Sequence, residues 1–157
     1  TDAPDTCEVV AVTGLTATAT SAQAPWKAYL FDATQAVDGR LATSWQPAKK
    51  KAVGEVLTIR LPRVLRVARV DVFNGFQTRD PLGDELVANG RIGDALITLT
   101  PTVRELMWSR FVTIGQPDHV RFPPTETDTI TIEVLSAAPG ELSDDLAVSE
   151  VKVFACK

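Results

Sequence analysis

The sequence predicts an all-β protein, an antiparallel jelly-roll β-sandwich of about eight strands. Short segments of alternating apolar and polar residues recur along the chain, glycine and proline interrupt them, and no long amphipathic helical pattern occurs. Such punctuated alternation is typical of sandwiches and jelly rolls. The 157 residues are the length of one ordinary domain, so we expect a single domain over residues 1–157, with its core between residues 7 and 156.

The expected strands follow from local patterns. Residues 8–20 are rich in valine and threonine, which favour strands. Residues 55–61 alternate, with leucine or isoleucine at positions 57, 59 and 61, and are expected to form a strand. Pro62 is expected to end this strand, and the next strand is expected at residues 64–73. The remaining strands are expected at residues 91–100, 103–114, 119–122, 129–134 and 148–154.

Three longer segments lack sustained alternation and are expected to form loops, at residues 21–51, 76–89 and 137–145. The first should contain one short helical turn near residues 34–37. Binding residues are found disproportionately on such loops, because a rigid scaffold positions them there.

The two cysteines, Cys7 and Cys156, lie almost at the two ends of the sequence. An end-to-end disulfide explains this placement, whereas the alternative is two unrelated buried thiols. The bond would stabilise the fold by up to about 5 kcal/mol in the loop-entropy model. Because disulfides persist in oxidising compartments, we expect a secreted, periplasmic or cell-surface protein.

The formal charge of −4 and the pI of about 5.0 disfavour nucleic acid as a partner, because nucleic-acid binding usually needs a basic surface. Membrane lipid is a weaker expectation than a glycan or protein ligand for the same reason. The sequence also contains no apolar stretch near the roughly 20 residues that span a bilayer.

The segment from Ala36 to Trp45 resembles the A-x-DG-x-x-x-T-x-W pattern of galactose-binding-domain-like β-sandwiches, which include discoidin domains and many carbohydrate-binding modules. Three further pieces occur in order, Asn74-Gly75-Phe76, Asn89-Gly90-Arg91 and Ser149-Glu150-Val151. Together they are most similar to the discoidin-related NADase-type glycan-binding domain, over residues 7–154.

The resemblance implies a structural calcium ion at the Asp38-Gly39 turn. Asp38 and Glu150 would supply carboxylates, and the turn from Arg40 to Thr43 would supply carbonyls and a hydroxyl, the oxygen ligands that calcium prefers. The alternative is a simple Asx turn in which Asp38 bonds its own backbone, with Glu150 an ordinary carboxylate at a strand edge.

The first loop holds the aromatic residues Trp26 and Tyr29 on either side of Lys27, a set suited to contact a sugar face and its hydroxyls. The alternative is that the loop folds back and buries these rings. The resemblance places Trp45, another aromatic residue of this region, in the core instead.

In the second loop, Phe76, Arg79 and Asp80 place an aromatic ring beside a guanidinium and a carboxylate, which could grip a polar ligand. Arg79 and Asp80 could equally form a surface ion pair, which contributes little to stability.

No enzyme is expected. His119 is the only histidine and is interpreted as a turn residue, and no nucleophile motif accompanies it. The resemblance and the loops together favour a non-catalytic glycan-binding module that binds through loops at one end of the sandwich. The alternative is a protein–protein interaction or adhesion module in a larger extracellular or periplasmic assembly.

Overall fold

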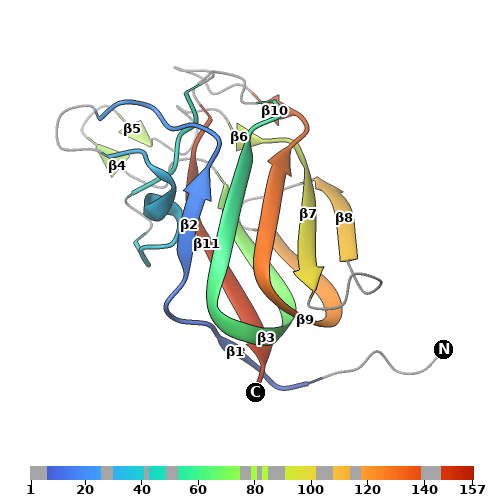
Figure 1. Cartoon of the computed structure of the whole chain (residues 1–157). Helices are drawn as coiled ribbons and strands as arrows, with labels where there is room; N and C mark the ends of the chain where they lie inside the picture. The colour runs from blue at the N-terminus through green and yellow to red at the C-terminus, as the bar shows by residue number, and fades with distance from the viewer. Residues whose placement is uncertain are drawn as a thin grey trace.

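In the computed structural model, two antiparallel β-layers pack face to face, and two long strands run through both of them (Figure 1). These strands are β3 (Val56–Asn74) and β9 (Asp118–Val134), which pair with each other in both layers. The predicted antiparallel β-sandwich is therefore confirmed. The structure describes residues 7–25, 30–40, 43–48, 53–74, 79–80, 83–84, 91–101, 108–113, 118–138 and 146–157.

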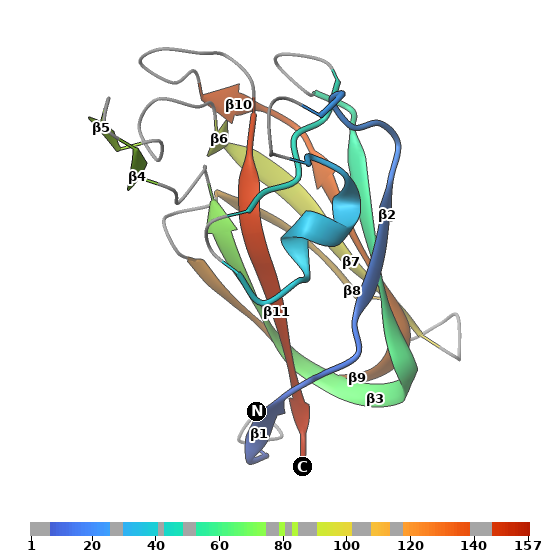
Figure 2. The same ribbon diagram turned by 90° about the vertical axis from the view of Figure 1, so that its left-hand side faces the viewer.

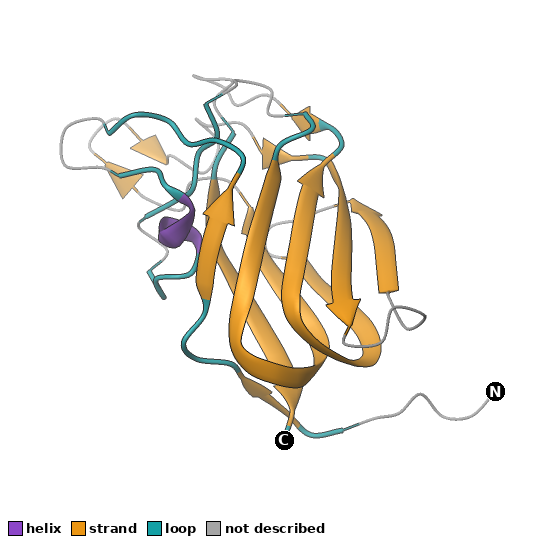
Figure 3. Ribbon diagram, in the orientation of Figure 1, coloured by secondary structure: helices purple, strands orange, loops and turns teal. Residues whose placement is uncertain are grey.

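Each layer combines one half of each long strand with shorter strands (Figure 3). In the first layer, β2 (Thr16–Ala19) pairs with the first half of β3, while β7 (Asp94–Pro101) lies between the second half of β9 and β8 (Trp108–Thr113). In the second layer, β11 (Val148–Cys156) pairs with the second half of β3 and with β1 (Val9–Ala11).

The core lies between the layers and takes one face of each strand. Alternation in the sequence puts the apolar positions inward, where each large side chain contributes about 1.5–3 kcal/mol by leaving water. The fully buried aliphatic residues of the strands include Leu57, Ile59, Val67, Val70, Val72, Ile97, Leu99, Ile130, Ile132, Val134, Val151 and Val153.

Proline does not end a strand where the sequence predicts it to. Pro62 lies inside β3, at a stretch where the register with β9 shifts between Arg60 and Leu65. Pro123 and Pro124 likewise lie inside β9, where the register shifts again. A missing N–H costs little at such irregularities. In both places, the two strands predicted on either side of the proline therefore form one continuous, bent strand.

Other elements also differ from the expectation. Residues 8–20 form two strands rather than one, and the predicted helical turn is a 3-10 helix, η1 (Ala33–Ala36). Two short ladders pair β4 (Arg79–Asp80) with β5 (Gly83–Asp84), and β6 (Arg91–Ile92) with β10 (Ala137–Ala138). The described part of the chain thus contains 11 strands in place of about eight.

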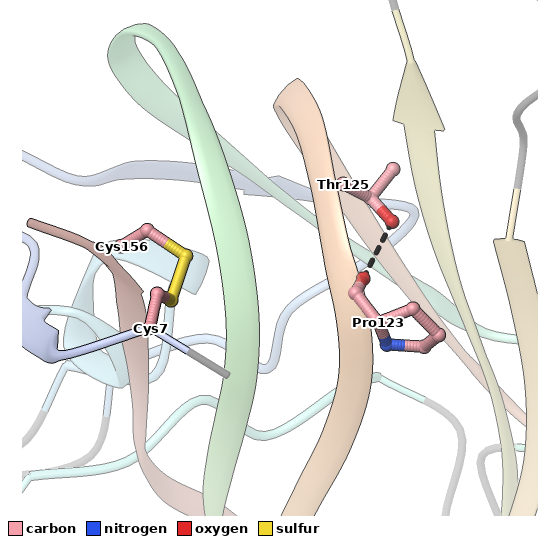
Figure 4. Close-up of a disulfide and its surroundings, with 4 residues drawn as sticks. All are labelled: Cys7, Pro123, Thr125 and Cys156. Atoms are coloured by element: carbon pink, nitrogen blue, oxygen red, sulfur yellow. Dashed lines mark hydrogen bonds between the residues drawn. A yellow bond between two sulfur atoms is a disulfide. The ribbon is translucent and has the colours of Figure 1, made fainter. Parts of the chain in front are cut away.

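The predicted disulfide joins Cys7 to Cys156, with the two Cα atoms 5.4 Å apart (Figure 4). It closes the ladder of β1 and β11, in which Val9 lies opposite Cys156. The disulfide and the end of β11 lie at one end of the sandwich, and the short ladders lie at the other (Figure 1).

Candidate functional site

The Asp38-Gly39 turn follows η1, which packs across β11 (Figure 2). Gly39 has a φ of 79°, a left-handed conformation that residues with a Cβ rarely adopt. The Arg40 amide donates to Oδ1 of Asp38 at 2.9 Å, so the aspartate closes an Asx-type turn. The predicted turn is therefore present, and its carboxylate is held in place.

Glu150 reaches this turn from β11. The Gly39 amide donates to its Oε2 at 3.1 Å, and the residue is only 3% exposed. Burial, opposed by the hydrogen bond from the Gly39 amide and reinforced by the neighbouring Asp38 carboxylate, raises the pKa of the Glu150 carboxyl to about 8. Oε1 is buried and has no hydrogen-bond partner among the residues that the structure describes.

Thr43 completes the group. Its hydroxyl donates to Oδ2 of Asp38, and lies 3.1 Å from the Arg40 carbonyl oxygen and 3.3 Å from that of Gln35. The structure therefore gathers all four predicted ligand residues, Asp38, Arg40, Thr43 and Glu150, into one oxygen-rich set.

This donor set has the chemistry of a site for a hard cation. Calcium takes carboxylate, hydroxyl and backbone carbonyl oxygens, and Glu150 offers a buried oxygen that accepts no hydrogen bond from the described residues. The described residues contain no cluster of three or more histidine, cysteine, aspartate or glutamate side chains. Backbone and hydroxyl oxygens would accordingly have to complete the ligand shell around two carboxylates.

A buried carboxylate fixes both ends of the first loop. Glu55, 5% exposed, accepts hydrogen bonds from the hydroxyls of Thr20 and Ser21, the latter at 2.7 Å. The Ser21 hydroxyl in turn accepts from the Ala48 amide at 2.9 Å, and the Ser21 carbonyl accepts from the Trp45 indole at 2.9 Å. The two stems of the loop, near residues 21 and 48, are thus held together.

The second loop begins from an equally fixed residue. Asn74, 1% exposed, donates through Nδ2 to the Ile92 carbonyl at 2.8 Å and accepts from the Ile92 amide at 2.9 Å. Ile92 also pairs with Ala137 across the ladder of β6 and β10. Asn74 therefore ties the strand before the second loop to the strand after it.

The predicted ligand-binding side chains stay predictions. Trp26, Lys27, Tyr29 and Phe76 lie outside the described residues. Arg79 and Asp80 form β4, where they lie opposite Asp84 and Gly83, and the structure describes their backbone alone.

Trp45 and His119 have clear positions. Trp45 is fully buried and bridges to Val148 of β11, so its predicted core role is confirmed. The interpretation of His119 as a turn residue is wrong, because it lies within β9, with Nδ1 2.9 Å from the Asp71 carboxylate.

The sequence reasoning missed Glu55, Asn74 and Asp71 as organising residues. A signal existed for Glu55, which shares its face of the strand with Leu57 and Ile59 and therefore points inward. Asp71, between Val70 and Val72, is on the outward face, where Arg69 of the same strand and His119 of β9 contact its carboxylate.

Comparison with solved structures identifies the same fold. The family 32 carbohydrate-binding module of NanJ from Clostridium perfringens, in complex with galactose, is 18% identical, with a TM-score of 0.69 over 94% of this chain and 99% of that one. CpGH89CBM32-5 from Clostridium perfringens, in complex with GalNAc-β-1,3-galactose, is 17% identical, with a TM-score of 0.64 over 90% and 95%. Chitosan-binding module 1 of a chitosanase/glucanase from Paenibacillus sp. IK-5 is 19% identical, with a TM-score of 0.59 over 88% and 92%.

Sequence comparison is more specific. Among curated proteins, no sequence matches the chain. In the described part of the chain, no helix has the length and apolar character needed to cross a membrane.

The model of one protein family matches residues 8–154, which is nearly the whole chain. The chain therefore belongs to the NAD glycohydrolase translocation F5/8 type C domain family.

Proposed function

We propose that this domain is a non-catalytic glycan-binding module that recognises its ligand through loops at the end of the sandwich remote from the disulfide. The observation that carries the proposal is the buried bonding that fixes the stems of both loops, through Glu55 and Asn74. Similar folds in complex with galactose and with GalNAc-β-1,3-galactose support the ligand class. The disulfide supports a secreted, periplasmic or cell-surface setting.

Fixed stems matter because a polar ligand that binds weakly can offset only a small loss of conformational entropy in the protein loops. The rings of Trp26 and Tyr29 would offer apolar faces to a sugar, and Lys27 would hydrogen-bond its hydroxyls. Phe76, Arg79 and Asp80 would contribute from the second loop. None of these groups needs to carry out a chemical step.

An array of neutral glycans, followed by titration calorimetry with galactose and N-acetylgalactosamine, tests this function. We expect saturable binding that Trp26→Ala or Tyr29→Ala weakens at least tenfold. The matched control is Leu30→Ala, which removes an exposed apolar side chain from the same loop. Silence across the array, with a protein partner that co-purifies with the chain, would instead favour an adhesion module.

We also propose that the Asp38 turn holds a structural calcium ion. The Asp38 and Glu150 carboxylates, the carbonyls of Gln35 and Arg40 and the Thr43 hydroxyl would be its ligands. The ion would supply positive charge that keeps both carboxylates ionised and ties the turn to β11. The buried, unpartnered Oε1 of Glu150 supports this assignment.

Thermal melting with chelator and with added calcium tests the site. We expect chelation to lower the melting temperature and calcium, but not magnesium at equal concentration, to restore it. Asp38→Asn should abolish the response to calcium. A melting curve that is the same in chelator and in calcium would refute the site.

A further inference from the structure

The outward face of the first layer carries threonines in register on four neighbouring strands, β2, β3, β9 and β7 (Figure 1). Thr58 of β3 lies between Thr18 of β2 and Thr131 of β9. Thr98 of β7 lies opposite Thr131 on the other side. The residues on either side of each threonine along its strand pack in the core, so these four side chains point outward.

A second row runs parallel to the first, two residues along each strand. In the same order of strands, it consists of Thr16, Arg60, Thr129 and Thr100. Thr16 and Thr100, at the two ends of this row, are exposed. Threonine thus occupies every position of the two rows except that of Arg60, and we call them the threonine rows.

The centre of the first row has hydroxyls that the fold does not use. In the described part of the chain, the hydroxyls of Thr18, Thr58 and Thr131 make no hydrogen bond to the protein. Thr18 is exposed, and Thr58 and Thr131 are partly exposed, so solvent or a ligand reaches all three. Because a hydroxyl both donates and accepts, each one can pair with a ligand hydroxyl in either direction.

Strand propensity alone does not account for this composition. Threonine favours strands in general, but one row on the outward face of the second layer is Lys152, Asp71 and His119. β2, whose one partner among the described strands is β3, lies at the edge of its layer, where proteins usually place charged side chains. Its residues are instead threonine and alanine. The first layer therefore keeps an uncharged hydroxyl surface where charge is the usual choice.

Over the described residues, the surface of the rows and their border has no net charge. Arg60 is the charged member of the rows, and the next row toward the loops contains Val56, Glu133 and Leu96. One guanidinium and one carboxylate balance, so neither a polyanion nor a polycation is favoured here. Val56 and Leu96 are partly exposed and add apolar contact beside the hydroxyls. This combination fits a neutral ligand whose surface alternates hydroxyl and C–H groups.

The spacing of the rows suits a polymer. Neighbouring strands are about 4.8 Å apart, so the first row spans about 14 Å over its four strands, with one hydroxyl at each step. Each step is close to the length of one sugar unit in an extended polysaccharide. Successive units of such a chain would each meet one threonine.

The twist of the sheet favours a single chain over a flat crystalline surface. Adjacent strands are rotated by about 20–25° relative to one another, so the row turns by about 60–75° from β2 to β7. A flat surface would touch only one or two of the strands. A single polysaccharide chain turns about its glycosidic bonds and can follow the row.

We propose that the threonine rows are a second binding surface, which takes a single chain of a neutral, hydroxyl-rich polysaccharide lying across β2, β3, β9 and β7. That the ligand is a glycan rests on the proposed function, but the position of the surface does not. The rows contain no aromatic ring on which a sugar stacks. Each unit therefore contributes little, and binding builds up only along the chain.

Affinity electrophoresis in gels that contain a soluble neutral polymer tests the surface, with dextran, laminarin, galactomannan and hydroxyethylcellulose as the four probes. The full chain carries Trp26→Ala, which removes binding at the loops. We expect at least one polymer to retard the protein, and a saturating concentration of galactose to leave the retardation unchanged. Fragments of that polymer too short to cross four strands should compete at least tenfold more weakly than longer ones.

In the same background, Thr58→Val/Thr131→Val should weaken polymer binding at least fivefold, because valine keeps the β-branched shape and loses the hydroxyl. Thr58→Ser/Thr131→Ser, which keeps both hydroxyls, should stay within twofold of the parent. The matched control is Thr13→Val/Thr125→Val, which makes the same change outside the rows and should change binding less than twofold.

If Thr58→Val/Thr131→Val melts abnormally, Thr18→Val/Thr100→Val makes the same change at exposed positions of the rows, with the same expected loss. Four outcomes would overturn the proposal: no retardation by any of the four polymers, displacement of the polymer by galactose, equal weakening by the row variant and the control, or an equal loss in the serine variant.

The loop site is measured separately, by galactose calorimetry on Thr58→Val/Thr131→Val with Trp26 intact. Failure of the proposed function would appear as no galactose binding by the unaltered chain. Failure of the threonine rows would appear in the gels alone, so the two failures are distinguishable.

Discussion

The amide of Gly39 donates a hydrogen bond to Glu150 across 111 residues of sequence, at 3.1 Å. This contact joins the turn after η1 to the last strand, and it brings the Asp38 carboxylate against a buried glutamate. Two carboxylates in one partly enclosed site repel each other. The turn is therefore a place where pH and cations should control stability.

We expect the calcium-free protein to lose stability as pH rises from about 4.5 to about 8. The pKa of Glu150 is raised from 4.5 to about 8 in the folded state, so the unfolded state binds fewer protons over this range. The stabilising contribution is complete below the unfolded pKa and is lost as pH rises through the folded one, at about 1.4 kcal/mol per pH unit.

Urea unfolding in chelator at several pH values measures this slope. Glu150→Gln should flatten it, whereas Glu126→Gln, at an exposed position of β9, should leave it in place. A slope that persists in Glu150→Gln would assign the pH dependence to other groups.

Removal of the Glu55 carboxylate should loosen the first loop. Glu55→Gln replaces an acceptor of two hydroxyl hydrogen bonds with a group that has one acceptor oxygen, and should cost about 1–3 kcal/mol of unfolding free energy. A double-mutant cycle with Ser21→Ala, measured by chemical denaturation, should show coupling above about 0.5 kcal/mol. Additive effects would mean that the contact contributes little.

Asn74→Ala should destabilise the fold by about 2–4 kcal/mol, because it leaves the buried amide and carbonyl of Ile92 without partners. Thr125→Ala provides the comparison, since it removes an exposed hydrogen bond to the Pro123 carbonyl and should cost less than about 1 kcal/mol (Figure 4). Thermal and urea unfolding measure both variants. If Asn74→Ala and Thr125→Ala lose the same stability, that result would argue against a special role for Asn74.

Reduction of the disulfide, or the double variant Cys7→Ser/Cys156→Ser, should lower the free energy of unfolding by up to about 5 kcal/mol. The reason is the long loop, since the two cysteines are 149 residues apart. Urea unfolding of the oxidised and reduced protein measures the difference. A loss below about 1 kcal/mol would mean that the ladder of β1 and β11 already holds the ends together.

Local pattern was enough to predict the strands but not their continuity. The alternation in residues 55–61 gave the inward positions of Leu57 and Ile59 correctly. Pro62 misled the prediction because its effect depends on whether the partner strand is in register at that point, which is a property of β9 rather than of β3.

The candidate site likewise contains some contacts that the sequence predicts and others that it does not. The Asp38 turn and its contact with Glu150 were predictable, because a sequence motif marks both halves. The contact between Asp71 and His119 was not, because it depends on which residues of two strands face each other. Cross-strand register is set by the whole sheet, so single-sequence patterns leave such pairs hidden.

The disulfide also determines how the domain would respond to mechanical force. Cys7 and Cys156 are covalently joined, so tension applied to the chain before the first and after the second passes directly through the sulfur atoms. The 148 residues between them lie outside the line of load, and neither the sheet ladders nor the loop stems would be pulled apart. A glycan held at the far end would then be released by rupture of its own contacts before the sandwich unfolds.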